Sequence, residues 1–500
     1  MFRHAPFDAV EDSPRLKNPL RRRLALLLLG LLAAAYGGAA LLQRAEAYDE
    51  GLIVSGAERI LHGQHPYTDF NTGYPPGQFY TVALVFRVFG TSLLAERIWD
   101  SLWRLAIVAA ACWLAHELAG KNLKLLPLAC CAVLIGATGY RLYPMISATL
   151  PCLCAVASAL RFTRTQNLRW IFVAGLWLGC TAPYRHDLAA CAGIAILGSV
   201  WRNRNALVWM MAGILVVAGP AAAWLTIMIP QHILRQSFLE FPKVNAAARH
   251  LPLLSSQSAL LLLLPMAIIA FAALDARRAP ADRRGPLVIL ATAAGLTLIL
   301  ATQRLDTVHA FPSLVLCLVI LGDSASPRFG RRVLIASAFL FYGVRPLLEW
   351  NAKLSVIRNE PASAIARAGP VRIFSDQAQA VQYIQDSLPS GEKLYVGTTT
   401  HSRISVNDAL FPFLAERPRA TRYDMWLPAM TNSAAVETEI VRELERKAIR
   451  FVVLFDAPTF EEPNLSSIDS GVRIVDDYLS SRYHEVAVFG RYHILQRIPL

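Results

Sequence analysis

From Leu24 to about Leu348 the sequence is a succession of apolar segments separated by short polar loops. A helix needs roughly 20 mostly apolar residues to cross a bilayer, and these segments approach or reach that length. The composition agrees, because 55% of residues are hydrophobic and only 17% are charged, against roughly 25% charged residues in a soluble domain. The sequence therefore predicts a polytopic α-helical membrane protein.

We expect about eleven transmembrane helices. Their approximate ranges are 23–43, 98–119, 123–140, 144–161, 168–183, 187–201, 205–229, 252–274, 286–302, 308–322 and 332–349. Together they make a membrane domain over residues 23–349, after a short N-terminal segment, 1–22. Residues 350–500 have ordinary soluble composition, which predicts a separate water-soluble domain.

The distribution of basic residues predicts the orientation of these helices. Arg21, Arg22 and Arg23 place residues 1–22 in the cytoplasm, because cytoplasmic loops are enriched in Lys and Arg. Alternation across the predicted spans then puts every later basic cluster on the same side. These clusters are Lys121 and Lys124; Arg161, Arg164 and Arg169; Arg202 and Arg204; Arg277, Arg278, Arg283 and Arg284; and Arg328, Arg331 and Arg332. The net charge of +13 is thus explained by topology rather than by nucleic-acid binding, and residues 350–500 are expected outside.

The apolar segment 77–90 is too short to span the bilayer and contains Arg87. Counting it as a span would move the later basic loops to the outer side. We therefore expect an amphipathic helix on the outer membrane surface, within a long outer loop, 44–97.

The C-terminal region has the pattern of an α/β domain. Amphipathic or helix-favouring stretches predict helices at 377–388, 407–415 and 434–447. Short apolar runs predict strands at 393–397, 450–455, 484–489 and 492–497. About 150 residues are enough for an independent core.

Polar and charged residues collect at the predicted outer ends of separate helices. Charged groups at membrane depth are costly and usually face a cavity or a partner, so a shared outer cavity is expected. Guanidinium groups there suit a phosphate, and a carboxylate suits a base. The residues are Asp49 and Glu50; His65, Tyr67 and Asp69; Arg141; Arg185, His186 and Asp187; and Arg304, Asp306 and His309.

Each of these groups also has a purely structural interpretation. Asp49 and Glu50 also fit solvated acids just beyond the end of a helix. Asp187 also fits the N-cap of the next helix. Arg304 and Asp306 are close enough in sequence to form a local ion pair, and Tyr67 and Asp69 suit loop packing. The eight cysteines lie in apolar segments, which favours packing over a metal site or disulfides.

The order of motifs near the N-terminus resembles a known family. After the first apolar segment come Asp49 and Glu50, then GQHPYTDF (63–70), YPPGQFY (74–80), FG (89–90) and Arg97. This order is similar to that of the polyprenyl-phosphate-sugar glycosyltransferases of the GT-C class, which include protein O-mannosyltransferases and lipid A aminoarabinose transferases. The likeness is close only over the first hundred residues; RHD (185–187) and RLDTVH (304–309) are similar to later outer-loop motifs.

The resemblance implies a GT-C-like fold and an enzyme that transfers a sugar from a polyprenyl-phosphate carrier, with inversion, to a glycolipid, polysaccharide or protein. It implies that Asp49 is the general base and that Glu50 orients it or helps to hold a divalent cation, for which His65 or Asp69 would be further ligands. Arg141, Arg185 and Arg304 would bind the donor phosphate. His65, Tyr67, Asp69, His186, Asp187, Asp306 and His309 would line the cavity. The site would face the periplasm from the inner membrane of a bacterial cell.

Two other functions fit the residues alone. A transporter or flippase for a lipid-linked or polar solute would also need an outward-facing polar cavity, but no repeat relates the two halves of the chain, as is common in transporters. A membrane-anchored assembly protein would place its function in residues 350–500, and the acids of the long first outer loop argue against it.

Overall fold

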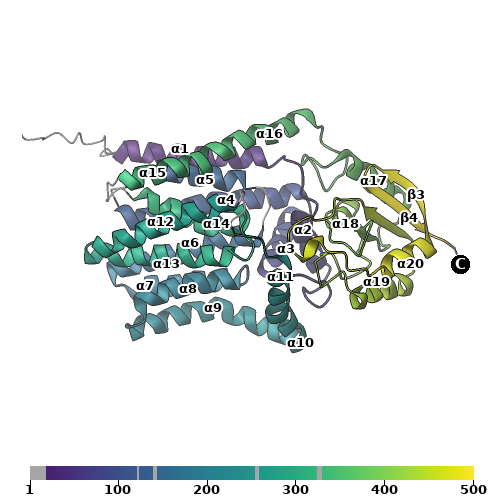
Figure 1. Ribbon diagram of the computed structural model, residues 1–500, viewed down its shortest axis with the longest axis horizontal. Coiled ribbons are helices and arrows are strands. Elements are labelled where there is room, and N and C mark those ends of the chain that lie inside the picture. Colours follow the sequence, from purple (N-terminus) through teal and green to yellow (C-terminus); the bar gives the residue numbers. More distant parts are fainter. Residues whose placement is uncertain (1–18, 121–122, 139–142, 254–257, 324–328, 500) are drawn as a thin grey trace, which may run out of the picture.

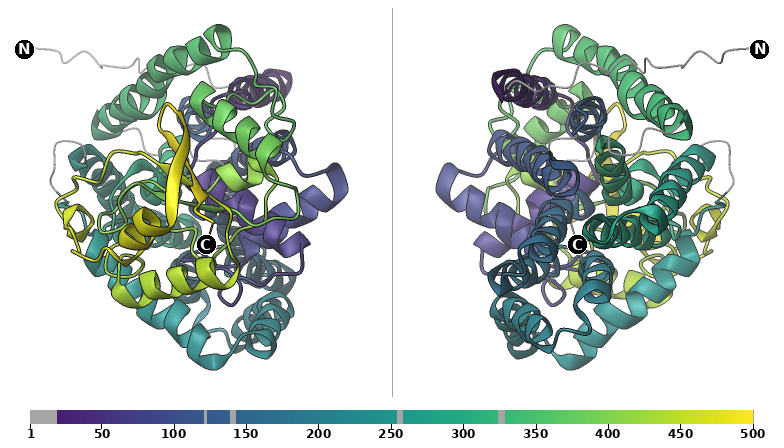
Figure 2. Two further views of the ribbon diagram at one scale, coloured as in Figure 1. Left: turned by 90° about the vertical axis from the view of Figure 1, so that its right-hand side faces the viewer. Right: turned by 90° about the vertical axis from the view of Figure 1, so that its left-hand side faces the viewer.

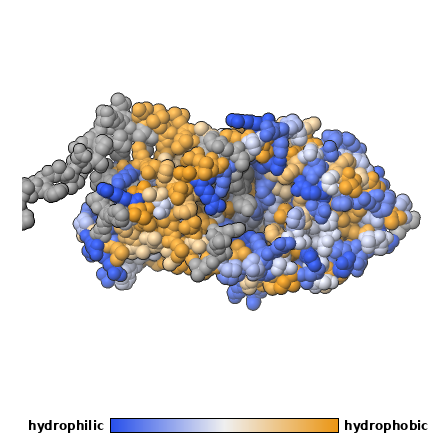
Figure 3. Space-filling view, turned by 45° about the horizontal axis from the view of Figure 1, so that its top comes forward, coloured by the Kyte–Doolittle hydropathy of each residue, from blue (hydrophilic) through white to orange (hydrophobic). Residues whose placement is uncertain are grey.

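The computed structural model describes residues 19–120, 123–138, 143–253, 258–323 and 329–499. A helical body occupies one end of the long axis and a domain of helices and strands the other (Figure 1). On the face shown in Figure 3, hydrophobic side chains dominate the helical body and polar side chains the C-terminal domain. Such a division of surface is what a membrane body with a water-exposed domain requires.

A helix or helical run is found at each apolar segment predicted to span the membrane. By length and hydropathy, six helices of the described chain suffice to cross a membrane, and the other apolar helices are shorter. The helices of the body run side by side along the long axis and are seen nearly end-on in Figure 2. They are α1 (Pro19–Ala40), α4 (Leu93–Ala119), α5 (Leu126–Ala137), α6 (Pro144–Thr165), α7 (Leu168–Thr181), α8 (His186–Val200), α9 (Arg204–Met228), α12 (Ala259–Arg278), α13 (Ala281–Ala301), α14 (Thr307–Gly322) and the run α15 (Phe329–Ala338), η3 (Phe339–Val344) and α16 (Arg345–Asn359). The number of spans and their orientation stay predictions.

Helices α6 and α14 form the centre of the body, where nearly every side chain is buried. Helix α9 lies at the edge and packs on α7 through glycines. A Cβ on Gly175 would lie 2.2 Å from the carbonyl oxygen of Met210, and a Cβ on Gly213 would lie 2.3 Å from that of Phe172. Glycine is therefore required for the two backbones to approach this closely.

Shorter helices lie between the body and the C-terminal domain. Helix α2 (Asp49–Leu61) was not predicted, whereas α3 (Gly77–Phe89) coincides with the predicted amphipathic segment. Leu84, Val88 and Phe89 on α3 are exposed, as expected for a helix that lies on a membrane surface. A ledge between α9 and α12 comprises α10 (Gln231–Arg235), η2 (Gln236–Glu240) and α11 (Phe241–Arg249).

The C-terminal domain contains a four-stranded sheet in the order β1-β2-β4-β3. Strands β1 and β2 are parallel, and β4 is antiparallel to both β2 and β3. Helix α17 packs on one face of the sheet, and α19 and α20 pack on the other. The bounds are α17 (Ser375–Ser387), β1 (Tyr395–Thr398), α18 (Phe411–Ala415), α19 (Ala434–Arg446), β2 (Phe451–Phe455), η4 (Leu465–Ser467), α20 (Ile474–Arg482), β3 (Tyr483–Phe489) and β4 (Tyr492–Arg497).

The four predicted strands are present, but the helix predicted at 407–415 begins only at Phe411. Asp408 explains the late start, because its Oδ1 accepts the backbone N–H groups of Leu410 and Phe411 at 3.0 and 2.9 Å. A carboxylate that satisfies these free N–H groups marks where a helix begins. Helix α20 was not predicted.

Helices α2 and α3 share a hydrophobic core with the C-terminal domain. Val54 and Phe79 from these helices belong to the same buried cluster as Ile384, Leu410 and Phe413. Gly51 permits the closest approach, since a Cβ there would lie 2.4 Å from the backbone nitrogen of Leu410. The start of α2 is therefore held by the C-terminal domain.

On the side of the helical body, the start of α2 is held by a buried ion pair. Arg97 on α4 donates from Nε and Nη2 to both carboxylate oxygens of Glu50, at 2.7 and 2.9 Å. The same guanidinium donates to the carbonyl oxygens of Leu41, Gln43 and Arg44, in the segment that joins α1 to α2. One side chain thus ties together α1, α2 and α4.

Replacing Arg97 by Met should lower the free energy of unfolding by roughly 3–5 kcal/mol, because Glu50 would be left buried without its cation. Thermal unfolding in lipid nanodiscs measures the change. The double variant Glu50→Leu/Arg97→Met removes both charges and should recover part of the loss. Wild-type stability in Arg97→Met would show that the ion pair does not hold this junction together.

Candidate functional site

A cavity of about 340 Å³ lies where the helical body, the short helices and the C-terminal domain meet. Its wall is contributed by the start of α2, the loop before α3, the start of α8, the end of α13, the start of α14, helix α11, and loops of the C-terminal domain. The polar lining includes Glu46, Tyr48, Asp49, Tyr74, Tyr143, Arg185, His186, Asp187, Asn245, Arg249, Gln303, Arg304, Asp306 and His309. The predicted outer-end groups near residues 49, 185 and 304 are thus brought into one place.

Asp49 is the first residue of α2 and lines this cavity. Tyr74 donates from Oη to Asp49 Oδ1 at 2.7 Å. Burial raises the pKa of Asp49, while the Tyr74 hydroxyl and the positive charge of Arg249 oppose the rise only in part. A carboxylate whose pKa lies above its usual value accepts a proton more readily, which suits a general base.

Glu50 points away from the cavity, into the ion pair with Arg97. Successive residues on a helix are rotated by about 100°, so neighbouring acids at a helix start face different surroundings. The pair that was expected to act together is therefore divided between a cavity residue, Asp49, and a residue that anchors α2.

Glu46 is a further carboxylate of the cavity, close to Asp49 in sequence, and the sequence analysis did not single it out. Its Oε1 accepts the backbone N–H of Tyr48 and its Oε2 that of Glu50, both at 3.0 Å. Burial and, next, the charge of Asp49 raise the pKa of Glu46 to about 8. The one signal in the sequence is that Glu46 precedes Asp49 by three residues. That spacing is informative only once α2 is known to begin at Asp49.

Among the described residues, the arginines that line the cavity are Arg185, Arg249 and Arg304. Arg185 is paired with Asp187, and its Nε donates to Asp187 Oδ1 at 2.9 Å. Arg304 donates from Nη1 to Glu462 Oε2 at 2.8 Å, and its Nε lies 3.6 Å from Asp306 Oδ2. Arg141, the third arginine singled out from the sequence, lies outside the described residues.

Arg249, at the end of α11, is the arginine that the sequence analysis missed. It lines the cavity, and its Nε is buried without a hydrogen-bond partner among the described residues. Its guanidinium carbon lies 5.9 Å from the ring centroid of Phe460. A buried donor that lacks an acceptor is costly, so this nitrogen is placed to take one from a ligand. No motif marks Arg249, which reaches the cavity only through the fold of the ledge.

Asp306 and His309 form a hydrogen-bonded pair at the start of α14. Asp306 Oδ1 accepts the backbone N–H groups of Val308 and His309, both at 2.9 Å, and lies 2.8 Å from His309 Nδ1. His309 Nε2 lies 3.2 Å from Tyr143 Oη. Asp306 is therefore a helix cap that also orients a cavity histidine. His186 lines the cavity near the ledge, with its ring 5.6 Å from that of Phe238.

His65, Tyr67 and Asp69 do not line this cavity, although the resemblance implied that they would. Asp69 Oδ2 accepts the backbone N–H of His65 at 2.7 Å. Tyr67 donates from its hydroxyl to the carbonyl oxygen of Tyr74 at 2.9 Å. These residues brace the loop that presents Tyr74 to Asp49, in line with the loop-packing interpretation of Tyr67 and Asp69.

Within the described ranges, no group of three or more His, Cys, Asp and Glu side chains is arranged to hold a metal ion. The carboxylate of Glu50, which was considered as a ligand beside Asp49, is bound to Arg97.

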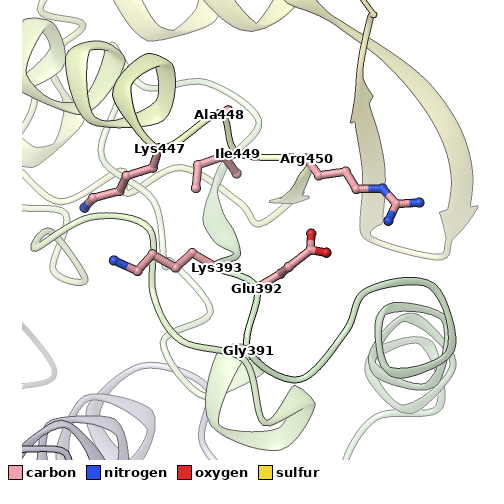
Figure 4. A pocket seen from close by; sticks show the side chains of 7 residues that line it. All are labelled: Gly391, Glu392, Lys393, Lys447, Ala448, Ile449 and Arg450. Atoms are coloured by element: carbon pink, nitrogen blue, oxygen red, sulfur yellow. The ribbon is translucent and has the colours of Figure 1, made fainter.

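A second hollow, of about 330 Å³, lies on the C-terminal domain. Lys393 and Lys447 extend toward one side of it, whereas Glu392 and Arg450 extend toward the other (Figure 4). Lys447 already donates to the carbonyl oxygen of Ala420. Among the described residues, its lining includes none of those predicted from the sequence, and Glu392 points away from the lysines. The first cavity is therefore the candidate functional site.

Comparison with solved structures identifies the fold. Crystal structures of ArnT from Cupriavidus metallidurans, bound to undecaprenyl phosphate and in the apo state, both superpose with a TM-score of 0.63. The match covers 96% of this chain and 99% or 98% of ArnT, at 13% and 14% sequence identity. The chain has the fold of ArnT. The GT-C-like fold implied by the sequence resemblance is therefore confirmed.

The mycobacterial arabinofuranosyltransferase AftD also matches, with a TM-score of 0.52 and 13% identity over 96% of this chain. The match covers only 40% of AftD. No protein-family model and no curated protein matches this sequence. The likeness to ArnT is thus one of fold.

A hydrophobic carbodiimide, which reacts with protonated buried carboxyl groups, should label Glu46. Because the pKa of Glu46 is raised to about 8, the group is protonated below that pH and labelling should fall as pH rises from about 6 to about 9. Peptide mass spectrometry locates the label, with Glu46→Gln as the control. Labelling at residue 46 that does not change over this range would contradict the assigned environment.

Proposed function

We propose that the protein is a membrane glycosyltransferase that moves a sugar from a polyprenyl-phosphate carrier to an acceptor hydroxyl. The observation that carries this proposal is a partly buried acid, Asp49, which shares one cavity with Arg185, Arg249 and Arg304 at the boundary of an apolar helical body. ArnT, which has the same fold, was crystallised with undecaprenyl phosphate. A cavity of this kind suits a ligand with an apolar tail and an anionic head.

In the proposed reaction Asp49 is the general base. Its carboxylate takes the proton of the acceptor hydroxyl while that oxygen attacks the anomeric carbon of the donor sugar. The bond between this carbon and the phosphate oxygen breaks, and the phosphate leaves with the electron pair. Attack from the face opposite the leaving group inverts the anomeric configuration. The hydrogen bond from Tyr74 fixes the direction of the carboxylate.

The leaving phosphate gains negative charge as its bond to the sugar breaks. Arg249 is the favoured ligand, because it lines the cavity and its Nε is buried with no hydrogen-bond partner among the described residues. Arg185 and Arg304 add positive charge, although both carry acidic partners here. Fixed cations placed where charge develops are often the largest contribution to catalysis. Glu50, paired with Arg97, is assigned no step in the reaction.

The acceptor would enter from the side of the C-terminal domain, where Met425, Trp426 and Phe460 line the cavity. It would be a glycolipid, a polysaccharide or a protein. The basic loops predicted from the sequence place the cavity and the C-terminal domain on the non-cytoplasmic side of the plasma membrane, the periplasmic face in a bacterium.

Asp49→Asn should reduce transfer of labelled sugar from a polyprenyl-phosphate donor by at least about 100-fold, because the amide cannot accept the proton. The assay uses purified protein in lipid, with folding checked by thermal unfolding. Asp282→Asn is the matched control, since it makes the same change at an exposed acid of α13. Transfer that survives Asp49→Asn would move the base to another acid, with Glu46 first. Loss of transfer in both variants would show that the effect is not specific to the cavity.

Arg249→Gln should raise the KM for the lipid-linked donor by roughly tenfold, because it removes one charge-assisted contact to phosphate. Steady-state kinetics with varied donor concentration measure the effect. Arg235→Gln, on the same ledge, is the control: Arg235 is largely exposed and pairs with Glu240 at 3.3 Å. A donor KM that is unchanged in Arg249→Gln would exclude Arg249 as a phosphate ligand.

A further inference from the structure

A loop of the C-terminal domain lies against the cavity. We call residues 456–473, which join β2 to α20, the capping loop. Phe460 of this loop lines the cavity beside Arg249. Asn464 donates from Nδ2 to the backbone oxygen of His250, at the end of the ledge, at 3.4 Å. The capping loop therefore contacts the end of the ledge where the ledge borders the cavity.

The strongest contact of the capping loop is the pair between Glu462 and Arg304. Both terminal nitrogens of Arg304 donate to the two carboxylate oxygens of Glu462, at 2.8 and 2.5 Å. The two side chains are about one-fifth exposed, at 22% and 21%. Burial alone would raise the pKa of Glu462, but hydrogen bonds from Arg304 and Asn464 lower it to about 2. The pair is therefore fully charged at neutral pH.

This arrangement has the geometry of phosphate recognition. A guanidinium presents two parallel N–H donors that fit a carboxylate and a phosphate equally well. Arg304 lines the cavity in which the donor phosphate is proposed to bind, yet Glu462 occupies its two terminal nitrogens. Arg249 lines the same cavity and keeps a buried donor without a partner in the described part of the chain. A phosphate that binds Arg249 would meet Glu462 as a competing anion at Arg304.

We propose that Glu462 is an internal competitor of the donor phosphate: it occupies Arg304 in the empty protein, and the phosphate displaces it. The inference rests on the proposed function, because it concerns the donor site of that reaction. Displacement also releases the capping loop from its ion pair with the helical body, and the 3.4 Å hydrogen bond from Asn464 to the ledge is weak. Backbone hydrogen bonds, such as that from Phe460 N–H to the carbonyl oxygen of Ile404 at 2.9 Å, still hold the loop to its own domain. Donor binding would thereby loosen the side of the cavity through which the acceptor enters.

Binding of undecaprenyl phosphate to the full-length protein in nanodiscs tests the competition. Glu462→Gln removes the competing charge, so its affinity should be roughly three- to tenfold higher than that of the wild type. Glu461→Gln is the matched control, because it makes the same change at the neighbouring exposed residue and should leave the affinity unchanged. A damaged fold would weaken binding, so an increase in affinity cannot come from misfolding.

A second measurement uses the wild-type protein and needs no variant. A protease that cuts after glutamate should cleave the capping loop at Glu461 or Glu462 faster when undecaprenyl phosphate is added, because the loop has lost its ion pair with the helical body. Equal or lower affinity in Glu462→Gln, or cleavage that the lipid does not accelerate, would overturn the competitor role while leaving the glycosyltransferase proposal intact. Wild-type protein that does not bind undecaprenyl phosphate would instead remove the proposed donor class, and the competitor role with it.

Discussion

The ion pair between Glu50 and Arg97 is the interaction on which the candidate site depends. Arg97 binds the Glu50 carboxylate and also the carbonyl oxygens of the segment that leaves α1. It thereby sets where α2 begins, and Asp49 is the first residue of α2. Separating two buried charges costs several kcal/mol, so this junction is rigid compared with ordinary surface loops. The proposed base, Asp49, is thus held next to this ion pair.

The C-terminal domain completes the same junction from the other side. Gly51 contacts the backbone of Leu410, and Ser55 donates to the carbonyl oxygen of Ala409 at 2.8 Å. Because α2 and α3 share a core with this domain, the domain is part of the site and not an appendage tethered to it. The capping loop adds a further contact between the two parts, since Glu462 of the C-terminal domain is paired with Arg304 of the helical body.

The sequence was informative where the signal is local. Hydrophobic segment length located the helices of the body, short apolar runs located the strands, and clustered polar residues at helix ends pointed to one cavity. It was not informative where the fold brings distant residues together. Glu50 and Asp49 are neighbours in sequence but face different surroundings, and Arg249 and Glu462 reach the cavity from a ledge and a loop that carry no motif. His65 and Asp69 belong to a motif, yet they stabilise the loop before α3, and Tyr74 of that loop lines the cavity in their place.

The central claim is that Asp49 and the cavity arginines carry out displacement at an anomeric carbon with lipid phosphate as the leaving group. The most direct test is to supply purified protein in lipid with isotopically labelled polyprenyl-phosphate sugars and a panel of outer-face acceptors, and to determine the anomeric configuration of the product by NMR. The proposed reaction predicts a transferred sugar of inverted configuration together with free polyprenyl phosphate. A product of retained configuration, or no transfer across the whole panel, would contradict it.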